Sequence, residues 1–172
     1  VLENSRAVMD YSMANLAYLA DRKIAYPHVF YVPLGGIQGY LEQQGLATKP
    51  EAIEKDIDVL FYGDVNSERR KKYISALQNK FNIVVIGNSF GAELQGAISR
   101  AKVVVNIHYY EGALLESTRV FECLSLGARV VSESAVDVDD YQHMNEAVTF
   151  VPVGDIDAMV DAVAKILASS EA

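Results

Sequence analysis

Two kinds of apolar pattern alternate along most of the chain, and this alternation predicts the fold. From residue 56 onward, short runs rich in valine and isoleucine are separated by longer segments whose apolar positions follow a helical spacing. The short runs predict strands at 58–62, 82–86, 102–107, 129–132 and 148–151. Continuous apolar strands joined by helices are typical of a parallel sheet covered on both faces. We therefore expect an α/β fold, a doubly wound open parallel sheet of the Rossmann-like kind with about five strands flanked by helices.

The segments between these strands predict the helices. Helical spacing covers residues 67–79, the stretch with Leu94, Ala97 and Ile98, residues 117–126, and a last helix that begins after Asp155. Gly127 follows the third of these helices in the usual position just past a helix end. Asp155 is a residue type that caps helix N-termini well. The pattern thus alternates strand and helix throughout this part of the chain.

The front of the chain is patterned differently. Apolar positions at helical spacing, from Met9 to Ala20, predict one helix over residues 3–21, and residues 28–32 predict a strand. Residues 37–55 are polar and lack a clear period, apart from a short helix expected near Tyr40. We therefore divide the chain into an N-terminal part (1–36), a linker (37–55) and a Rossmann-like domain (56–172). Because the chain begins with Val1 inside a predicted helix, we expect it to belong to a longer protein.

The charge of the chain argues against nucleic acid as a partner. The 172 residues carry a net charge of −8, and the longest basic run is the four residues 69–72. Proteins that bind DNA or RNA normally present a dominant basic surface. No apolar run approaches the length of a membrane-spanning helix. We expect a cytoplasmic protein, and peripheral association with a membrane stays an open alternative.

Residue types that bind metals or act as nucleophiles are sparse. Cys123 is the single cysteine, and His28, His108 and His143 have no metal-ligand spacing. A Gly-x-Ser-x-Gly elbow is missing, which argues against a Ser-His-Asp hydrolase. The acidic run 137–140 is interpreted as a solvated loop, with a cation site as the weaker alternative. We expect neither a metal nor a cofactor.

The loop after the third predicted strand has the richest chemistry. A helix N-terminus offers free N–H groups and partial positive charge, so the helix start near Ser117 suits a phosphate. Thr118 adds a hydroxyl and Arg119 adds charge, while Glu122, one turn further, suits the two hydroxyls of a ribose. A simpler interpretation remains open, in which Ser117 only caps the helix and Glu122 pairs with Arg119 at i, i+3.

Other loops at the same edge of the sheet offer weaker candidates. Gly63 allows a ligand to approach the backbone, and Arg69, Arg70 and Lys71 follow within one turn, so that one of them, with Arg69 as the named candidate, is placed to reach a diphosphate. A solvated basic helix face is the favoured interpretation of these three residues. Gly87 offers backbone groups to a base, or it is a plain turn. His108 ends a strand at the expected crevice, which favours a polar role.

One segment resembles a known family. Residues 118–127 read Thr-Arg-Val-Phe-Glu-Cys-Leu-Ser-Leu-Gly and are similar to the T-R-x-F-E-x-x-x-x-G segment of GT-B glycosyltransferases. A strand follows, and the Val-Pro-Val-Gly-Asp of residues 151–155 resembles the closing unit of the family. Residues 56–167 thus resemble the C-terminal donor-binding domain, with closest likeness to glycosyl transferases group 1 and CgeB-like proteins. Residues 1–36 resemble the last helix and strand of the N-terminal domain.

The resemblance implies a function for the chain. It would be the donor-binding half of a glycosyltransferase that takes a nucleotide-diphosphate sugar without a metal and passes the sugar to an unknown acceptor (a glycan, a lipid-linked molecule or a protein). The rest of the N-terminal domain would be a missing partner, and without it transfer would be inefficient.

The resemblance also implies roles for single residues. Glu122 matches the glutamate that holds the ribose, and residues 117–119 match the segment near the diphosphate. Leu114 occupies the position where many relatives have an earlier glutamate. His108, Glu111 and Glu116 are therefore the catalytic candidates.

Two other functions were weighed. A receiver-like module also has five parallel strands, but it needs an acidic pair after the first strand and an aspartate at the end of the third. Here the corresponding residues are Tyr62-Gly63-Asp64 and Asn106-Ile107-His108, which disfavours that class. A catalytically inactive GT-B-like module that binds nucleotide or serves as a scaffold stays open, because Leu114 replaces the earlier glutamate.

Overall fold

The computed structural model describes residues 4–24, 28–47 and 49–170 of the chain. Its centre is a sheet of five parallel strands in the order β4-β3-β5-β6-β7. These strands are β3 (Ile57–Tyr62), β4 (Ile83–Ile86), β5 (Ala101–Asn106), β6 (Arg129–Glu133) and β7 (Val148–Val151). The predicted α/β fold with an open parallel sheet is confirmed, because the valine-rich runs that predicted strands are the strands of this sheet.

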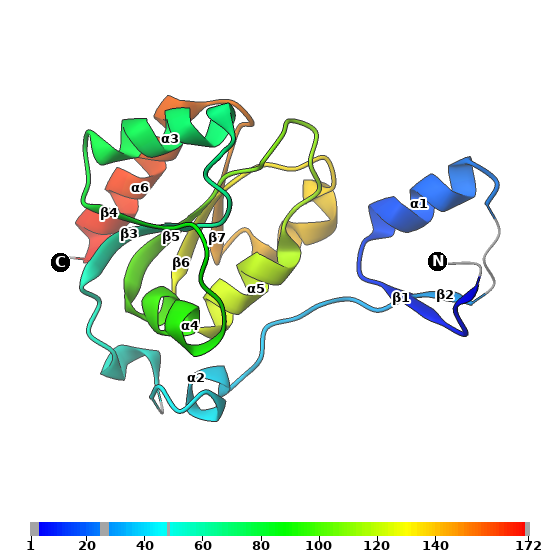
Figure 1. Cartoon of the computed structure of the whole chain (residues 1–172), viewed down its shortest axis with the longest axis horizontal. Coiled ribbons are helices and arrows are strands. Elements are labelled where there is room, and N and C mark those ends of the chain that lie inside the picture. Colours follow the sequence, from blue (N-terminus) through cyan, green and yellow to red (C-terminus); the bar gives the residue numbers. More distant parts are fainter. Residues whose placement is uncertain (1–3, 25–27, 48, 171–172) are drawn as a thin grey trace.

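Helices cover both faces of the sheet (Figure 1). They are α3 (Glu68–Gln78), α4 (Gly91–Arg100), α5 (Ser117–Ser125) and α6 (Ile156–Ser170). Side chains of β3 alternate between the two faces: Val59 and Phe61 pack in the core with α3 and α6, while Leu60 and Tyr62 pack in the core with α4 and α5. Each helix therefore buries its apolar side against one face of a sheet that is apolar on both.

The strand order creates a crevice at one edge of the sheet. The chain moves outward from β3 to β4 and then returns to place β5 on the other side of β3. The connections that leave β3 and β5 therefore run to opposite faces and separate. In open α/β sheets, ligands bind at such a switch point, beyond the carboxyl ends of the strands. The loops that follow Tyr62 and Asn106 flank this point.

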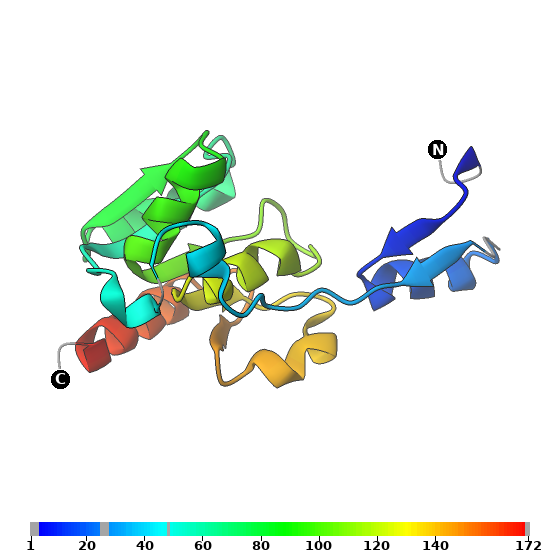
Figure 2. The same cartoon turned by 90° about the horizontal axis from the view of Figure 1, so that it is seen from below.

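A smaller unit lies at the front of the chain, apart from the five-stranded sheet and joined to it by an extended segment (Figures 1 and 2). It consists of β1 (Val8–Asp10), α1 (Met13–Asp21) and β2 (Val29–Tyr31), with β1 and β2 paired in parallel. Large apolar side chains on it are exposed, among them Met9 at 75% and Phe30 at 54%.

The predicted helix over residues 3–21 is wrong in its first half, and residue 3 lies outside the described residues. Residues 8–10 form a strand because their backbone pairs with residues 29–31, far along the chain. Ser12 then caps α1: its Oγ accepts a hydrogen bond from the backbone N–H of Asn15 at 3.3 Å. The carboxylate of Asp10 accepts from the N–H of Ser12 at 2.8 Å, which fixes the turn between strand and helix.

The segment between the two units carries α2 (Tyr40–Gln43) and a 3₁₀ turn (Pro50–Ala52). Leu41 is buried against the α4–α5 face of the sheet. Further along, the ammonium of Lys55 donates to the backbone carbonyls of Ser99 at 2.7 Å and Gly127 at 2.9 Å. The predicted linker therefore packs on the domain, and its short helix lies near Tyr40 as expected.

The acidic stretch before β7 forms a 3₁₀ segment, Val138–Met144, rather than a loose loop. Asp139 and Asp140 are exposed, as a solvated loop requires. Asp137 is buried, and its Oδ1 accepts a hydrogen bond from the N–H of Leu115 at 2.8 Å. The expectation of a solvated Asp137 is thus wrong, because this carboxylate anchors the loop before α5.

In the part of the chain that the structure describes, no helix is long and apolar enough to cross a membrane.

Candidate functional site

A cleft of about 800 Å³ opens at the switch point of the sheet. The carboxyl ends of β3 and β4, the loop before α5 and one side of α5 form its walls, and residues of the 34–40 segment close it. Six residues singled out from the sequence line it: Gly63, Gly87, Glu116, Thr118, Arg119 and Glu122. They come from three separate loops and one helix, so the fold gathers most of the predicted site residues in a single cavity.

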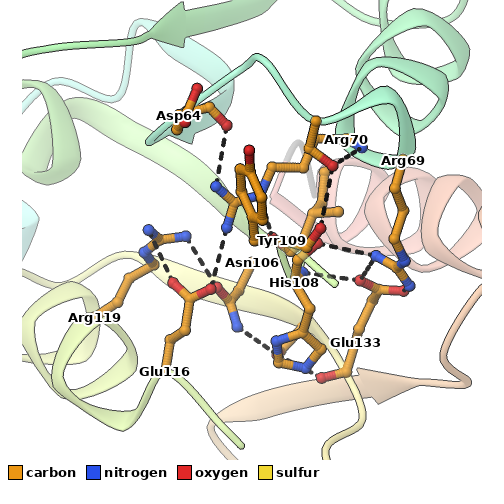
Figure 3. Close-up of polar contacts among 12 residues, drawn as sticks. Asp64, Arg69, Arg70, Asn106, His108, Tyr109, Glu116, Arg119 and Glu133 are labelled. Atoms are coloured by element: carbon orange, nitrogen blue, oxygen red, sulfur yellow. Dashed lines mark hydrogen bonds and ion pairs between the residues drawn. The ribbon is translucent and has the colours of Figure 1, made fainter. Parts of the chain in front are cut away.

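Two arginines and one glutamate form an ion-pair cluster at the edge of the cleft (Figure 3). Glu116 Oε1 lies 3.1 Å from Arg70 Nη2, and Glu116 Oε2 lies 2.9 Å from Arg119 Nη2. The side chain of Glu116 is 29% exposed, against 5% for Arg70 and 15% for Arg119. Two guanidinium groups share one carboxylate, so the cluster has a net positive charge.

Arg70 is fixed in place by the elements around it. Its Nε donates to the carbonyl of Ile107 at 2.8 Å, and its Nη1 donates to the carbonyl of Asp64 at 3.0 Å. The guanidinium also lies over the rings of Phe61 and Tyr109, 5.5 Å and 5.3 Å from their centres. Burial lowers the pKa of Arg70 from its ordinary value. These contacts tie the start of α3 to the loop after β5.

Arg119 in α5 is held from the sheet side. Its Nη1 donates to Oδ1 of Asn106 at 3.1 Å, and its guanidinium lies 4.7 Å from the centre of the Tyr62 ring. Asn106 in turn donates from Nδ2 to Oγ of Ser132 at 3.0 Å, and both of these side chains are buried. Asn106 thus holds the guanidinium of Arg119 through its side-chain amide. This role was not predicted from the sequence, because Asn106 falls within a buried strand.

The backbone of Gly63 lies directly against the guanidinium groups of Arg70 and Arg119. Its φ of +129° is a conformation that side chains rarely adopt. A Cβ at this position would lie 3.1 Å from Arg119 Nη2 and 3.5 Å from Arg70 Nη1. Glycine therefore keeps open the space in front of the guanidinium groups, and the approach of a ligand to this backbone stays a prediction.

Arg69 does not take part in the cleft, contrary to its expected place beside a diphosphate. Its guanidinium forms an ion pair with both carboxylate oxygens of Glu133 and donates from Nη1 to the carbonyl of His108 at 3.1 Å. Helix α3 turns Arg69 toward Glu133 of β6 and Arg70 toward Glu116, because successive residues of a helix point about 100° apart. Arg70 is thus the arginine of α3 that pairs with Glu116 at the edge of the candidate site, and it is not itself among the residues that line the cleft.

Two of the three catalytic candidates also lie away from the cleft wall. His108 is buried, with its backbone N–H donating to Oε2 of Glu133 at 2.9 Å and its Nε2 lying 3.0 Å from the carbonyl of Ser134. Glu111 is exposed in the loop after β5. Neither residue is among those that line the cleft. Glu116 is the candidate that lines it.

The start of α5 also differs from the interpretation in which Ser117 caps the helix and Glu122 pairs with Arg119. Glu116, not Ser117, is the N-cap residue, and Ser117 is the buried first residue of the helix. Arg119 forms its i, i+3 ion pair with Glu116, so Glu122 is not its partner in that contact. Glu122 lines the cleft one turn further along α5, where the sequence analysis expected it. Ser117 itself does not line the cleft.

Exposed aromatic side chains line the mouth of the cleft, and the sequence analysis did not select them. Phe90, at the start of α4, is 80% exposed, and Tyr110, in the loop before α5, is 65% exposed. Exposed aromatic residues that gather at a cavity commonly mark a binding surface. The signal available in the sequence was their position, directly after predicted strands of a parallel sheet.

Over residues 4–24, 28–47 and 49–170, no three His, Cys, Asp or Glu side chains gather as a metal site. The charged residues that line the cleft are instead Arg119, Glu116 and Glu122, and Arg70 lies behind Glu116. Such a set suits an anionic ligand with hydroxyl groups: guanidinium groups bind phosphate oxygens, and a carboxylate accepts hydrogen bonds from hydroxyls.

Comparisons with known proteins identify the fold. No family model matches the chain, and no curated protein matches its sequence. Among solved structures, the chain matches sucrose-phosphate synthase from Thermosynechococcus elongatus with a TM-score of 0.60 and 18% sequence identity. The match covers 99% of this chain and 51% of that protein, so the chain spans about half the length of its structural neighbour.

The fold is GT-B-like. At this level of identity the likeness concerns the fold and not the residues of the site. It agrees with the predicted resemblance to a GT-B domain, while the narrower likeness to CgeB-like proteins receives no support from it.

Proposed function

We propose that this chain binds a nucleotide-diphosphate sugar and forms the donor-binding half of a glycosyltransferase. The observation that carries the proposal is that Arg119 and Glu122 line one cleft at the switch point of a GT-B-like fold, with Arg70 behind them in the ion-pair cluster of Glu116. Positive charge lies at one end of α5, and a carboxylate lies one turn further along the same helix. A nucleoside diphosphate has the same order of groups, phosphates followed by ribose.

The diphosphate would lie at the N-terminus of α5, facing Gly63. Backbone N–H groups at a helix start and the helix dipole favour negative charge, and the two guanidinium groups add strong donors. When a sugar leaves its donor, negative charge develops on the diphosphate. Positively charged groups placed there beforehand stabilise that charge in the transition state. Arg70 and Arg119 suit this task because both are already oriented by the protein.

The nucleoside would extend from there along α5 toward β4. Glu122 would accept hydrogen bonds from the ribose hydroxyls, which a carboxylate does well because it has two oxygens with free lone pairs. The base would then lie over the carboxyl end of β4, near Gly87 and Phe90, both of which line the cleft. Backbone groups of this loop would contact the base edge.

The acceptor remains outside the proposal, as an unidentified glycan, lipid-linked molecule or protein. The 34–40 segment and Tyr11 of the front unit line the cleft, so that unit borders the proposed donor site. A second candidate function is nucleotide binding without transfer. It is favoured by Leu114, which lines the cleft at the position where the resembled family often has a glutamate. Assaying the longer parent protein for release of nucleoside diphosphate from a panel of sugar nucleotides separates the two.

Calorimetric titration of the chain with nucleoside diphosphates and with inorganic pyrophosphate tests the proposal. Wild-type chain should bind at least one nucleoside diphosphate more tightly than pyrophosphate. Replacing Glu122 with alanine should weaken nucleoside diphosphate binding by roughly tenfold or more, since a hydrogen bond to a charged group contributes about 1.5–3 kcal/mol. Pyrophosphate binding should not change, because pyrophosphate has no ribose.

The matched control is Glu146→Ala, which removes a carboxylate from an exposed position outside the cleft. Its affinities should equal those of the wild type. Equal affinity of Glu122→Ala and wild type for every nucleoside diphosphate would refute the ribose assignment. A wild-type chain that binds neither nucleoside diphosphates nor pyrophosphate would refute the donor-binding proposal as a whole.

A further inference from the structure

Glu116 covers the arginine pair on the side of the cleft. Its two oxygens reach Arg70 Nη2 and Arg119 Nη2 at 3.1 Å and 2.9 Å, and Figure 3 shows the carboxylate between the two guanidinium groups. Glu116 lines the cleft and is more exposed than either arginine. Arg119 lines the cleft, whereas Arg70 is buried behind Glu116, so an anion that approaches the arginine pair from the cleft meets a carboxylate already bound to both.

The arginines do not depend on Glu116 for their orientation. Arg70 is held by the carbonyls of Ile107 and Asp64 and by two aromatic rings. Arg119 is held by Asn106 and lies against the ring of Tyr62. These contacts would persist without the Glu116 carboxylate. The main contribution of Glu116 to the cluster is thus its negative charge, which cancels one of the two positive charges.

We propose that Glu116 is a built-in competitor of phosphate, which occupies the arginine pair when the cleft is free and is displaced when a diphosphate binds. This inference rests on the proposed function, because it takes the arginine pair as the diphosphate site. Phosphate oxygens and the Glu116 carboxylate use the same Nη2 donors, and like charges repel at short range. Binding therefore exchanges one anion for another, with no covalent step.

Because of this exchange, Glu116 would select anionic ligands by the amount of negative charge that they carry. A ligand with one weak negative charge gains little by replacing a carboxylate, whereas a diphosphate offers several oxygens and more charge to both guanidinium groups. Glu116 would thus lower the affinity for all phosphate ligands and keep weakly charged anions out of the cleft. Contacts that bind only the nucleoside, such as those proposed for Glu122, would not depend on it.

A contrasting role predicts the opposite result. If Glu116 were needed to hold the two arginines side by side, its loss would let them separate, and phosphate binding would weaken. Replacing Glu116 with glutamine tests the two roles directly, because the side chain keeps its size and loses its charge. Competition predicts tighter binding in Glu116→Gln, and positioning predicts weaker binding.

The experiment is calorimetric titration of wild type, Glu116→Gln and Glu116→Asp with inorganic pyrophosphate and with the nucleoside diphosphate that wild type binds. We expect Glu116→Gln to bind both ligands about three- to tenfold more tightly, with a larger gain at low ionic strength because salt screens the repulsion. Glu116→Asp retains the charge on a shorter side chain that does not span both arginines, and it should show a smaller gain. Urea unfolding curves verify that each variant is folded.

Glu146→Gln is the matched control, since it removes the same unit charge from an exposed position outside the cleft. It should leave both affinities unchanged. Unchanged or weaker pyrophosphate binding in both Glu116 variants overturns this inference. The proposed function is judged separately with Arg119→Gln: weaker pyrophosphate binding in that variant leaves the proposed function standing, and unchanged binding refutes it together with the role of Glu116.

Discussion

Glu133 binds the guanidinium of Arg69 through both of its carboxylate oxygens, although Glu133 is fully buried at the end of β6. Three further donors reach the same carboxylate: Tyr73 Oη at 2.6 Å, the N–H of His108 at 2.9 Å and the N–H of Gly154 at 3.0 Å. The carboxylate therefore joins α3, the loop after β5 and the loop after β7. It holds in place the loop that carries Glu116 to the cleft.

We predict that Glu133→Gln strongly destabilises the fold. The variant leaves a partly buried guanidinium without its counter-charge, and breaking a buried ion pair by removing one partner costs about 3–5 kcal/mol. The measurement is the free energy of unfolding from urea titration followed by circular dichroism. Glu68→Gln serves as the control, because Glu68 pairs with Lys71 on the surface and such pairs contribute about 0–1 kcal/mol. Equal losses in the two variants would contradict the role of Glu133.

The same carboxylate should make stability depend on pH in the acid range. Burial alone would raise the pKa of Glu133, but the hydrogen bonds from Arg69, Gly154, Tyr73 and His108 outweigh burial and hold the pKa below its ordinary value of 4.5. A lowered pKa in the folded state gives stability that is complete above the unfolded-state pKa and is lost as the pH falls through the folded-state pKa.

Between about pH 6 and pH 3, the free energy of unfolding should thus fall more steeply for wild type than for Glu133→Gln. Wild type and Glu133→Gln share all other acidic groups. The difference between their slopes of unfolding free energy against pH therefore reports the contribution of Glu133. The measurement is urea unfolding at a series of pH values. Parallel curves over this range would show that Glu133 has a similar pKa in the folded and unfolded states.

The sequence predicted the sheet well because its strands are buried on both faces. Such strands read as continuous apolar runs separated by helical patterns, which predicts a parallel sheet with ligands beyond the carboxyl ends of its strands, while the strand order that sets the switch point comes from the structure. Glu122 was predicted correctly as a residue that faces a crevice, since a helix that packs on a sheet has one polar side. These features depend on local pattern and on general rules of topology.

Other features depend on contacts between residues far apart in the sequence. Met9 fits a helical period, but residues 8–10 pair with residues 29–31, and local spacing carries no trace of that pairing. Arg69 and Arg70 are chemically identical neighbours on different sides of α3, and their partners, Glu133 and Glu116, lie 64 and 46 positions away. Glu133 itself follows a valine-rich strand as one more polar residue, with no sequence signal for the donors that surround it.

Gly127 and Gly112 offer a matched pair for separating backbone strain from steric conflict. Their φ angles are nearly equal, +75° and +74°. A Cβ at Gly127 would lie 2.6 Å from Cβ of Pro50, whereas nothing lies within 4 Å of a Cβ at Gly112. Gly112→Ala should therefore cost about 1–2 kcal/mol, the penalty for a side chain in the left-handed region. Gly127→Ala should cost at least about 1 kcal/mol more, as overpacking does.

Urea unfolding of both variants measures these costs. The double variant Gly127→Ala with Pro50→Gly tests the cause, because removal of the proline ring relieves the conflict. Its loss of stability should be smaller than the sum of the two single losses, since residues in contact are not additive. Additive losses would mean that the 3₁₀ turn at Pro50–Ala52 does not pack against the end of α5 in solution.

Phe90 should contribute to nucleotide binding through its ring alone. It is 80% exposed at the start of α4, just beyond Gly87, and it lines the cleft at the end where the base is proposed to lie. A base that stacks on an aromatic side chain gains about 1–3 kcal/mol. Phe90→Ala should thus weaken nucleoside diphosphate binding by roughly five- to a hundredfold, with little regard for the identity of the base.

Three comparisons in the same calorimetric titration make this prediction specific. Phe90→Trp should retain the affinity, because its ring also stacks on a base, and pyrophosphate binding should be equal in all variants. Phe30→Ala removes an exposed aromatic side chain of β2 that does not line the cleft, so it should behave as wild type. If Phe90→Ala weakened pyrophosphate binding as much as nucleoside diphosphate binding, the ring would act on the shape of the cleft rather than on the base.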